Sequence, residues 1–410
     1  MSISNKLFLI LIATIFSVTN VWARPFNEVV QDAKQQGFAG IISQTKNGKT
    51  QIEPVNDDTF DENTQFAIGS ISKIFTQIAI LQLAEQGKID LNDPINTYLD
   101  INQFPNDWQE WMPKITVRDL IEHRSGLPAL PYWSEGTQAI FHHAGKKKSL
   151  QQLFHNGENA HITYSLLQKN LRNSDEDGTY YSNIGYNLLA LIIESVSGIS
   201  YDEYLSANIF SPAKMDNSFS GTQANYSFKD LLYLHSAMAK PKIYPINFNS
   251  KQANSETYLV TINPKTQKNE RDFNFVFAYG AGSIISSVSD LNKWLAAVFK
   301  SDKLLTTQKY KQYLIQLDIE DNIWGHQGEL PGYQSIVLYD LEKKRSVVIL
   351  SNLNYDMFSL YHELVELSGK NINDFDLRGG ESGVEREFNH ALEKCPLLAP
   401  ANVALDLLEN

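Results

Sequence analysis

The sequence predicts an α+β fold, in which one antiparallel sheet built from both ends of the chain is flanked by helices and a mainly helical region is inserted between. Two patterns predict this class. Runs with strand character occur before residue 56 and again after residue 280, and strongly apolar helical patterns fill much of the interval. We therefore assign the sheet part to about residues 30–70 and 275–370, and the helical part to about residues 71–274.

The first residues have the composition of a secretory signal. Lys6 precedes an apolar run from Leu7 to Phe16, and Val21-Trp22-Ala23 places small residues where a signal peptidase reads them. The run is too short for a comfortable membrane span. We expect residues 1–23 to be cleaved after Ala23, giving an exported chain, periplasmic or secreted, without a stable membrane span.

A hairpin and a helix open the rest of the chain. Phe38–Gln44 and Thr50–Val55 have strand character, and Asn47-Gly48 between them is a typical hairpin turn. A helix is expected to follow from Ser70, because Ile74, Ile78 and Leu81 recur at helical spacing; it would end at Gly87.

The predicted helical region contains recognisable starts and stops. Thr116 begins a short helix that closes before Ser125–Pro128, and a strongly apolar helix runs from Gly185 to Gly198. Residues 134–180 between them are polar and irregular, which indicates a surface insertion at a cleft rim. Two further helices are predicted, at Tyr201–Ile209 and near Ser227–Ala239.

Strand character returns in the last third. The predicted order is a strand at Gly280–Ser286, a helix at Val288–Phe299, strands at Ile323–Gly328, Gln334–Tyr339 and Arg345–Asn352, and a covering helix at Phe358–Leu367. We take residues 24–370 as one domain and leave residues 371–410 as a tail of unknown role.

Composition excludes several functions. The net charge is −12 and no block of basic residues occurs, so nucleic acid is not an expected partner. Cys395 is the only cysteine, which excludes an internal disulfide or a cysteine-based metal site. His142-His143 has no partner at ligand spacing, and His362-Glu-Leu-Val-Glu366 lacks the second histidine of a zinc-protease helix. We expect no cofactor and no metal.

Ser70 and Lys73 carry the first chemical signal. Residues three apart lie on the same face of a helix, and the helix N-terminus favours negative charge that develops at a serine oxygen. A serine hydroxyl is a weak nucleophile unless a base lies beside it. The spacing therefore predicts an activated serine, although a Ser-x-x-Lys tetrapeptide alone is weak evidence.

Two further motifs follow in order, and the set of three resembles a known family. Ser70-Ile-Ser-Lys73, Tyr181-Ser-Asn183 and His326-Gln-Gly328 are similar to the three motifs of the serine β-lactamase and penicillin-recognising family. A Tyr-x-Asn second motif and a His-x-Gly third motif look like the branch of class C β-lactamases, D-Ala-D-Ala carboxypeptidases and family VIII esterases. The resemblance covers roughly residues 30–367 and implies a β-lactamase/transpeptidase-like fold.

The resemblance implies a role for each motif residue. Ser70 would form an acyl-enzyme, and Lys73 and Tyr181 would share the roles of base and proton shuttle, with the choice between them left open. Asn183 would bind Lys73 or a substrate amide. The remaining expected site residues are His326, which would orient Tyr181 or substrate, Gly328, which would let substrate approach the strand, and Glu329, whose backbone N–H would join that of Ser70 in an oxyanion hole.

The third motif departs from the pattern of the penicillin-recognising enzymes. His326 and Gln327 replace the lysine and the threonine or serine that help to bind the carboxylate of a β-lactam or of a terminal D-Ala. A small-molecule or peptidoglycan-derived substrate is expected, cleaved at an ester, an amide or a β-lactam bond. A D-Ala-D-Ala carboxypeptidase or penicillin-binding protein, and a non-catalytic cell-wall-binding relative, are the alternatives.

Overall fold

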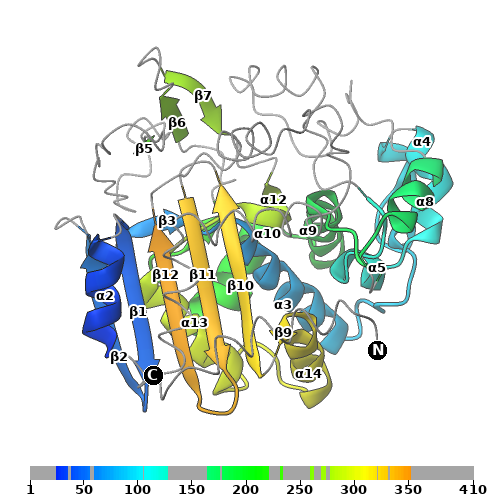
Figure 1. The fold of residues 1–410 in the computed structure, drawn as a ribbon. Helices are drawn as coiled ribbons and strands as arrows, with labels where there is room; N and C mark the ends of the chain where they lie inside the picture. The colour runs from blue at the N-terminus through cyan, green and yellow to red at the C-terminus, as the bar shows by residue number, and fades with distance from the viewer. Residues whose placement is uncertain are drawn as a thin grey trace, which may run out of the picture.

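The central element is a six-stranded antiparallel sheet with strand order β2-β1-β12-β11-β10-β9 (Figure 1). Its strands are β1 (Gly40–Lys46), β2 (Lys49–Val55), β9 (Ile319–Glu320), β10 (Ile323–Leu330), β11 (Tyr333–Asp340) and β12 (Arg345–Ser351). Because β1 pairs with β12, with Gly40 opposite Ser351, the two ends of the described chain are joined in one sheet, and the predicted α+β fold is confirmed.

The computed structural model describes residues 25–35, 38–55, 60–104, 106–127, 164–175, 178–220, 231–233, 259–262, 269–273, 278–320, 322–330 and 333–351. Two small sheets accompany the large one. The first contains β3 (Gln65–Ala67), β8 (Ile284–Ser287) and β4 (Phe219–Ser220), and the second contains β5 (Leu231–Tyr233), β6 (Leu259–Ile262) and β7 (Asn269–Phe273).

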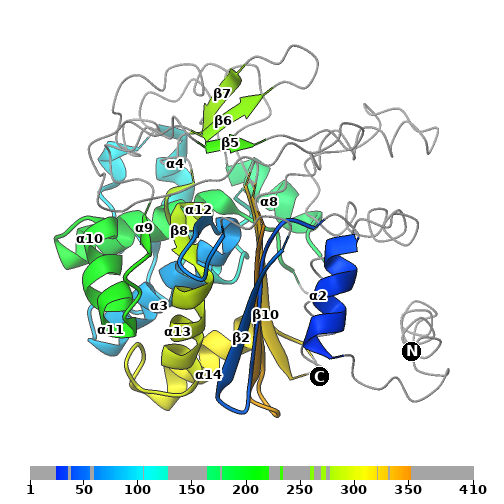
Figure 2. The same ribbon diagram turned by 90° about the vertical axis from the view of Figure 1, so that its left-hand side faces the viewer.

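Helices cover both faces of the large sheet (Figure 2). Of the helices in the described residues, only α2 (Phe26–Gln35) lies on one face, where Phe26, Val29 and Val30 pack against strand residues such as Ile42 and Val347. The helices of the other side form the larger core: α3 (Ser72–Glu85), α4 (Asn106–Trp111), α5 (Val117–Ile121), α8 (Tyr164–Arg172), α9 (Asn183–Ser197), α10 (Tyr201–Leu205), α11 (Ser211–Ala213), α12 (Tyr279–Gly282), α13 (Val288–Phe299) and α14 (Gln308–Leu317).

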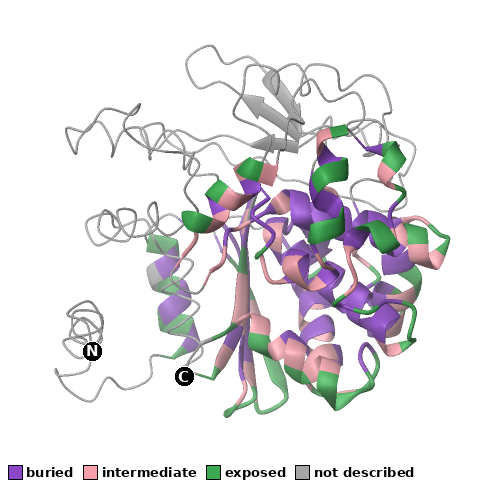
Figure 3. Cartoon of the chain, turned by 90° about the vertical axis from the view of Figure 1, so that its right-hand side faces the viewer, coloured by how far each residue is buried: buried purple, intermediate pink, exposed green. Residues whose placement is uncertain are grey.

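Helices α3 and α9 supply many residues of this core, and Figure 3 shows buried residues concentrated among the helices beside the sheet. Every residue of α3 from Ser72 to Ala84 is buried, which is typical of a helix enclosed on all sides. Among the described residues, no single helix is long and apolar enough to cross a membrane. The bent pair Asn183–Ser197 and Tyr201–Ala213 passes on length and composition, but its first helix is mostly buried inside the protein.

Local chemistry sets the ends of the helices near the site. The Thr116 side chain accepts from the backbone N–H of Asp119 while Asp119 accepts from that of Thr116, so a capping box starts α5 where the sequence predicted a helix. Helix α9 has Ser182 as its N-cap and begins at Asn183, two residues earlier than predicted. It ends at Gly198, which has φ +76°. These caps determine where Tyr181 and Asn183 stand.

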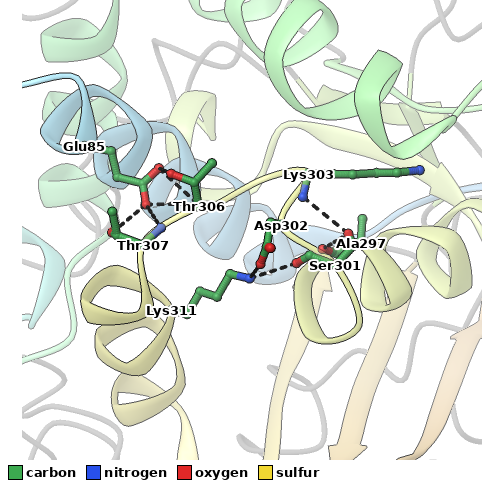
Figure 4. Close-up of polar contacts among 8 residues, drawn as sticks. All are labelled: Glu85, Ala297, Ser301, Asp302, Lys303, Thr306, Thr307 and Lys311. Carbon is green, nitrogen blue, oxygen red and sulfur yellow. Dashed lines mark hydrogen bonds and ion pairs between the residues drawn. The ribbon is translucent and has the colours of Figure 1, made fainter.

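The last turn of α3 is tied to the start of α14 through Glu85 (Figure 4). Its carboxylate accepts hydrogen bonds from the backbone N–H and the hydroxyl of both Thr306 and Thr307, at 2.7–3.1 Å. Lys311 in α14 pairs with Asp302 in the preceding loop. The buried helix and the helix beside the C-terminal strands are therefore held together by charge-assisted bonds.

Three predicted elements were wrong. The segment from Gly280 begins as helix α12 and becomes strand β8 only at Ile284, because Gly280 is packed against α9: a Cβ there would lie 2.2 Å from the carbonyl oxygen of Tyr186. Residues 231–233 form a strand instead of a helix, since they pair with β6. Residues 164–172, predicted as irregular, form α8.

Other predictions were confirmed or fall outside the described residues. The hairpin turn places Asn47 and Gly48 at φ +53° and +74°, and α13 covers the predicted residues 288–299. The helix predicted from Tyr201 is α-helical only to Leu205 and continues as a π-helical turn over Ser206–Phe210. The predictions that concern the signal at 1–23, the helix at 358–367, the tail at 371–410, Cys395 and His142-His143 lie outside the described residues.

Candidate active site

Ser70 lies on a single 3-10 turn, Gly69–Ile71, directly before α3. The turn begins with Gly69 at φ +49°, a conformation that suits glycine. The Ser70 side chain is partly exposed, whereas Lys73, one turn further on, is fully buried. The structure thus presents a hydroxyl at the surface with an amine beneath it, as the Ser-x-x-Lys spacing predicted.

Three side chains of the first two motifs meet at the Ser70 hydroxyl. Lys73 Nζ donates to Ser70 Oγ at 2.9 Å, and Ser70 Oγ lies 2.8 Å from Tyr181 Oη. Because the lysine donates into a lone pair of Ser70, the Ser70 hydroxyl proton can point to Tyr181 Oη. Tyr181 is 111 residues from Ser70, so only the fold brings them together.

The buried amine of Lys73 is held by polar and aromatic groups. It donates to the carbonyl oxygen of Ala281 in α12 at 3.0 Å. It also lies 4.7 Å from the ring centroid of Tyr181 and 5.7 Å from that of Tyr186. The short helix at 279–282, absent from the sequence prediction, is thus what supplies a carbonyl oxygen to Lys73.

The second motif stands at the start of α9. Ser182 is the N-cap and accepts from the backbone N–H of Gly185 at 3.0 Å, which fixes the turn that carries Tyr181. Asn183 is the first residue of the helix and is partly exposed. The predicted role of Asn183 toward Lys73 or a substrate amide stays a prediction.

The third motif lies in strand β10, beside the Ser70 turn. A Cβ on Gly328 would lie 2.0 Å from the carbonyl oxygen of Ile68 and 2.5 Å from Ser335 Oγ, so only glycine allows this approach. Ser335 Oγ donates to the same Ile68 carbonyl at 2.8 Å. Strand β10 therefore packs against the turn that carries Ser70, and the predicted role of the Glu329 N–H in an oxyanion hole stays a prediction.

His326 belongs to the same electrostatic cluster as Lys73. Burial and, to a lesser extent, the Lys73 ammonium lower the pKa of His326 to about 3, against a smaller opposing effect of the backbone bond to Gln327. The imidazole is therefore neutral at ordinary pH. Consequently it supplies no positive charge where the penicillin-recognising enzymes carry a lysine.

His123 is the functional candidate that the sequence analysis did not single out. Its ring stacks on Tyr181 with centroids 4.6 Å apart and an angle of 27° between ring planes. Its Nδ1 accepts from the backbone N–H of Ser182 at 3.0 Å. The only signal in the sequence was its place at the end of the short helix predicted from Thr116, since both contacts are long-range.

Within the part of the chain that the structure describes, no group of three or more His, Cys, Asp or Glu side chains is placed to hold a metal ion. The chemistry that the arrangement supports is that of a serine hydroxyl flanked by an amine and a phenol. Such a constellation fits nucleophilic catalysis through an acyl-enzyme.

A family model and a curated relative each match most of this chain. Residues 26–367 match the family model described as Beta-lactamase. The chain is 24% identical over 319 residues to penicillin-binding protein 4* of Bacillus subtilis, covering 72% of this chain and 62% of that protein's length. It therefore spans about three fifths of that relative.

Solved structures show the same fold. A penicillin-binding protein from Bacillus halodurans superimposes with a TM-score of 0.55 at 18% identity, covering 85% of this chain and 100% of that one. The D-amino acid amidase from Ochrobactrum anthropi SV3 in complex with D-phenylalanine superimposes with a TM-score of 0.52 at 20% identity, covering 80% of this chain and 91% of that one.

The sheet flanked by helices has the β-lactamase/transpeptidase-like fold, and it carries a serine whose hydroxyl lies within hydrogen-bond distance of a lysine and a tyrosine. Since the family model covers most of its length, the protein belongs to the Beta-lactamase family.

Proposed function

We propose that this protein is an exported serine hydrolase that works through an acyl-enzyme on Ser70. The observation that carries the proposal is the position of Ser70 Oγ, 2.9 Å from Lys73 Nζ and 2.8 Å from Tyr181 Oη. In the first step Oγ bonds to the acyl carbon of the substrate, and the hydroxyl proton passes to the Lys73–Tyr181 pair. That proton then goes to the leaving alcohol or amine, and water hydrolyses the acyl-enzyme.

Backbone groups would stabilise the negative charge on the acyl oxygen. The N–H of Ser70, at the start of a helix, and the N–H of Glu329, in strand β10, are the proposed donors. Gly328 contributes by leaving room between the strand and Ile68. Asn183 and His326 are proposed to face the substrate rather than to exchange protons with Ser70.

The third motif favours an ester or a D-amino-acid amide over a β-lactam. A β-lactam and a terminal D-Ala both carry a carboxylate that a cation usually binds. Here the residue at the lysine position is His326, which is neutral because its pKa is about 3. The likeness to a D-amino acid amidase extends to the fold and gives the second substrate class to test.

A substrate panel tests this proposal with Ser70→Ala as the matched control. We expect the wild type to hydrolyse p-nitrophenyl butyrate or D-phenylalanine amide and to form no lasting adduct with benzylpenicillin, while the Ser70→Ala variant is inactive. A persistent penicillin adduct on the wild type alone would instead indicate a penicillin-binding peptidase. Hydrolysed penicillin without an adduct would indicate a β-lactamase.

The panel also tests the non-catalytic alternative. If the wild type and the Ser70→Ala variant behave alike on every substrate, while a peptidoglycan fragment still binds, the protein is a binding relative and the proposal is wrong. Export is tested separately by the N-terminal mass of the protein recovered outside the cytoplasm, which we expect to begin after Ala23.

A further inference from the structure

We propose that His123 is a positioning residue that holds Tyr181 against Ser70. This inference rests on the proposed function, because it assigns His123 an effect on catalysis that passes through the Tyr181 hydroxyl. His123 lies two residues after the end of helix α5, in the described stretch that ends at residue 127.

His123 contacts three consecutive residues around the second motif. Its backbone carbonyl accepts from the N–H of Tyr180 at 2.8 Å, and its Nδ1 accepts from the N–H of Ser182 at 3.0 Å. Between these two bonds its ring stacks on Tyr181 at 4.6 Å. The two hydrogen bonds hold the backbone on either side of Tyr181, and the stack sets the plane of its ring.

The contacts define the charge and the tautomer of His123. A backbone N–H can only donate, so Nδ1 must keep its lone pair, and the proton of the neutral ring is on Nε2. Burial lowers the pKa of His123 well below 6.5, with further effects of Lys73 and His326. A protonated ring would present a donor to the Ser182 N–H and break the contact, so the neutral form is the one that positions Tyr181.

His123 is itself fixed by its surroundings. Its ring packs on Tyr186 with centroids 5.0 Å apart, and the Tyr186 hydroxyl donates to the carbonyl of Ile121 at 2.9 Å and accepts from Gln77 at 2.7 Å. The backbone of His123 has φ +55°, a left-handed conformation that non-glycine residues adopt infrequently. Residue 123 is therefore held in an unusual conformation that aims its ring at Tyr181.

Two substitutions separate the contributions of the ring and the acceptor. His123→Asn suits the left-handed backbone and removes the stacked ring, whereas His123→Phe keeps the ring and removes the Nδ1 acceptor. Lys214→Asn is the matched control, because Lys214 is exposed, has φ +60° and lies at the end of α11, away from the site. The control should leave activity unchanged.

The readout is the rate of Ser70 labelling by a fluorophosphonate ester, in which the Oγ–P bond forms and fluoride leaves. Where the ester substrate is turned over, kcat and KM are measured as well. We expect His123→Asn to slow labelling and kcat by about 10- to 100-fold with KM little changed, because a small displacement of Tyr181 is enough for such a loss. His123→Phe should show a smaller loss of the same kind.

A double-mutant cycle with Tyr181→Phe distinguishes positioning from general weakening of the fold. If His123 acts through the Tyr181 hydroxyl, His123→Asn should cause less than about a twofold further loss in the Tyr181→Phe background. Full activity of both His123 variants, or losses that multiply in the double variant, would overturn the inference. Full activity of Tyr181→Phe alone would overturn it as well, because His123 would then have no catalytic hydroxyl to act through, whereas an unlabelled and inactive wild type would contradict the proposed function.

Discussion

Gly328 and Ile68 lie in direct backbone contact: a Cβ on Gly328 would approach the Ile68 carbonyl oxygen to 2.0 Å. Ile68 immediately precedes the turn that carries Ser70, and Gly328 immediately precedes Glu329. This contact therefore sets the distance between the nucleophile and the proposed oxyanion-hole donor of strand β10.

Gly328→Ala should impair both activity and stability. The methyl group must displace the strand from the Ser70 turn, and overpacking of this kind costs about 1–3 kcal/mol of unfolding free energy. Loss of one oxyanion-hole donor corresponds to about a 10²- to 10³-fold lower kcat. Urea denaturation and ester hydrolysis measure the two effects.

Gly185→Ala provides the matched control for this substitution. The nearest atom to a Cβ at Gly185 lies at 3.6 Å, an ordinary contact, and the residue sits in helix α9. Its unfolding free energy should stay level or rise. Equal behaviour of the two alanine variants would contradict the role assigned to the Gly328 contact.

Lys73→Met should separate catalysis from folding. The amine is fully buried and bonded to Ser70 and Ala281, so its loss removes a proposed proton acceptor and is expected to lower kcat by about 10²- to 10⁴-fold. A buried cation carries a desolvation penalty, and an apolar side chain of similar size is often neutral for stability. We therefore expect melting temperatures that are similar to wild type.

The exposed Lys88 gives the corresponding control, since Lys88→Met should change neither quantity. If Lys73→Met unfolded the protein while ester hydrolysis by its folded fraction continued at the wild-type rate, Lys73 would be structural rather than catalytic.

Acidification should destabilise the protein through His326. The folded-state pKa of His326 is about 3, whereas the model value for an exposed histidine is 6.5. Below the pKa of His326 in the unfolded chain, the unfolded chain binds a proton that the folded chain does not bind. The contribution of His326 to the unfolding free energy is therefore fully present above about pH 6.5 and is lost as the pH falls toward 3. His123 contributes with the same sign.

The size of the His326 effect can be measured by urea denaturation at about pH 7 and about pH 5. When the pH is lowered from about 7 to about 5, protonation of His326 in the unfolded chain should decrease the unfolding free energy by up to about 2 kcal/mol. The decrease is about 1.4 kcal/mol per pH unit below the pKa of His326 in the unfolded chain. His326→Asn should flatten the profile by that amount. Parallel profiles of variant and wild type would show that His326 is not held neutral by folding.

Glu85→Gln should weaken the connection between α3 and α14. Partial burial alone would raise the pKa of Glu85, but the hydrogen bonds from Thr307 and Thr306 outweigh it and lower the pKa. Glutamine keeps the shape and loses the charge, so we expect a loss of about 1 kcal/mol, as for a helix cap. The effect should shrink at low pH, where the wild-type carboxyl is protonated. A constant difference across pH would contradict this explanation.

The parts of the fold that the sequence predicted are those with strong local signals. The Asn47-Gly48 turn, the capping residue Thr116 and the apolar spacing after Ser70 each act within a few residues, and the structure contains all three elements. The order of the three motifs then predicted which distant segments must meet, because nucleophile and base have to share one site.

The parts that were missed depend on contacts between distant segments. Helix α12 replaces a predicted strand because Gly280 packs on the backbone of Tyr186, 94 positions away along the chain. Strand β5 exists through its pairing with β6. His123 shows no local sign of function, since its role depends on Tyr181 and Ser182, which lie directly before helix α9.

The central claim is that Ser70 is an activated nucleophile, and intact-mass analysis after reaction with a fluorophosphonate ester tests it most directly. We predict one adduct per wild-type chain, located on the peptide that contains Ser70, and no adduct on Ser70→Ala. An unlabelled wild type, or equal labelling of Ser70→Ala, would contradict the claim, because the hydroxyl beside Lys73 and Tyr181 would then not be activated.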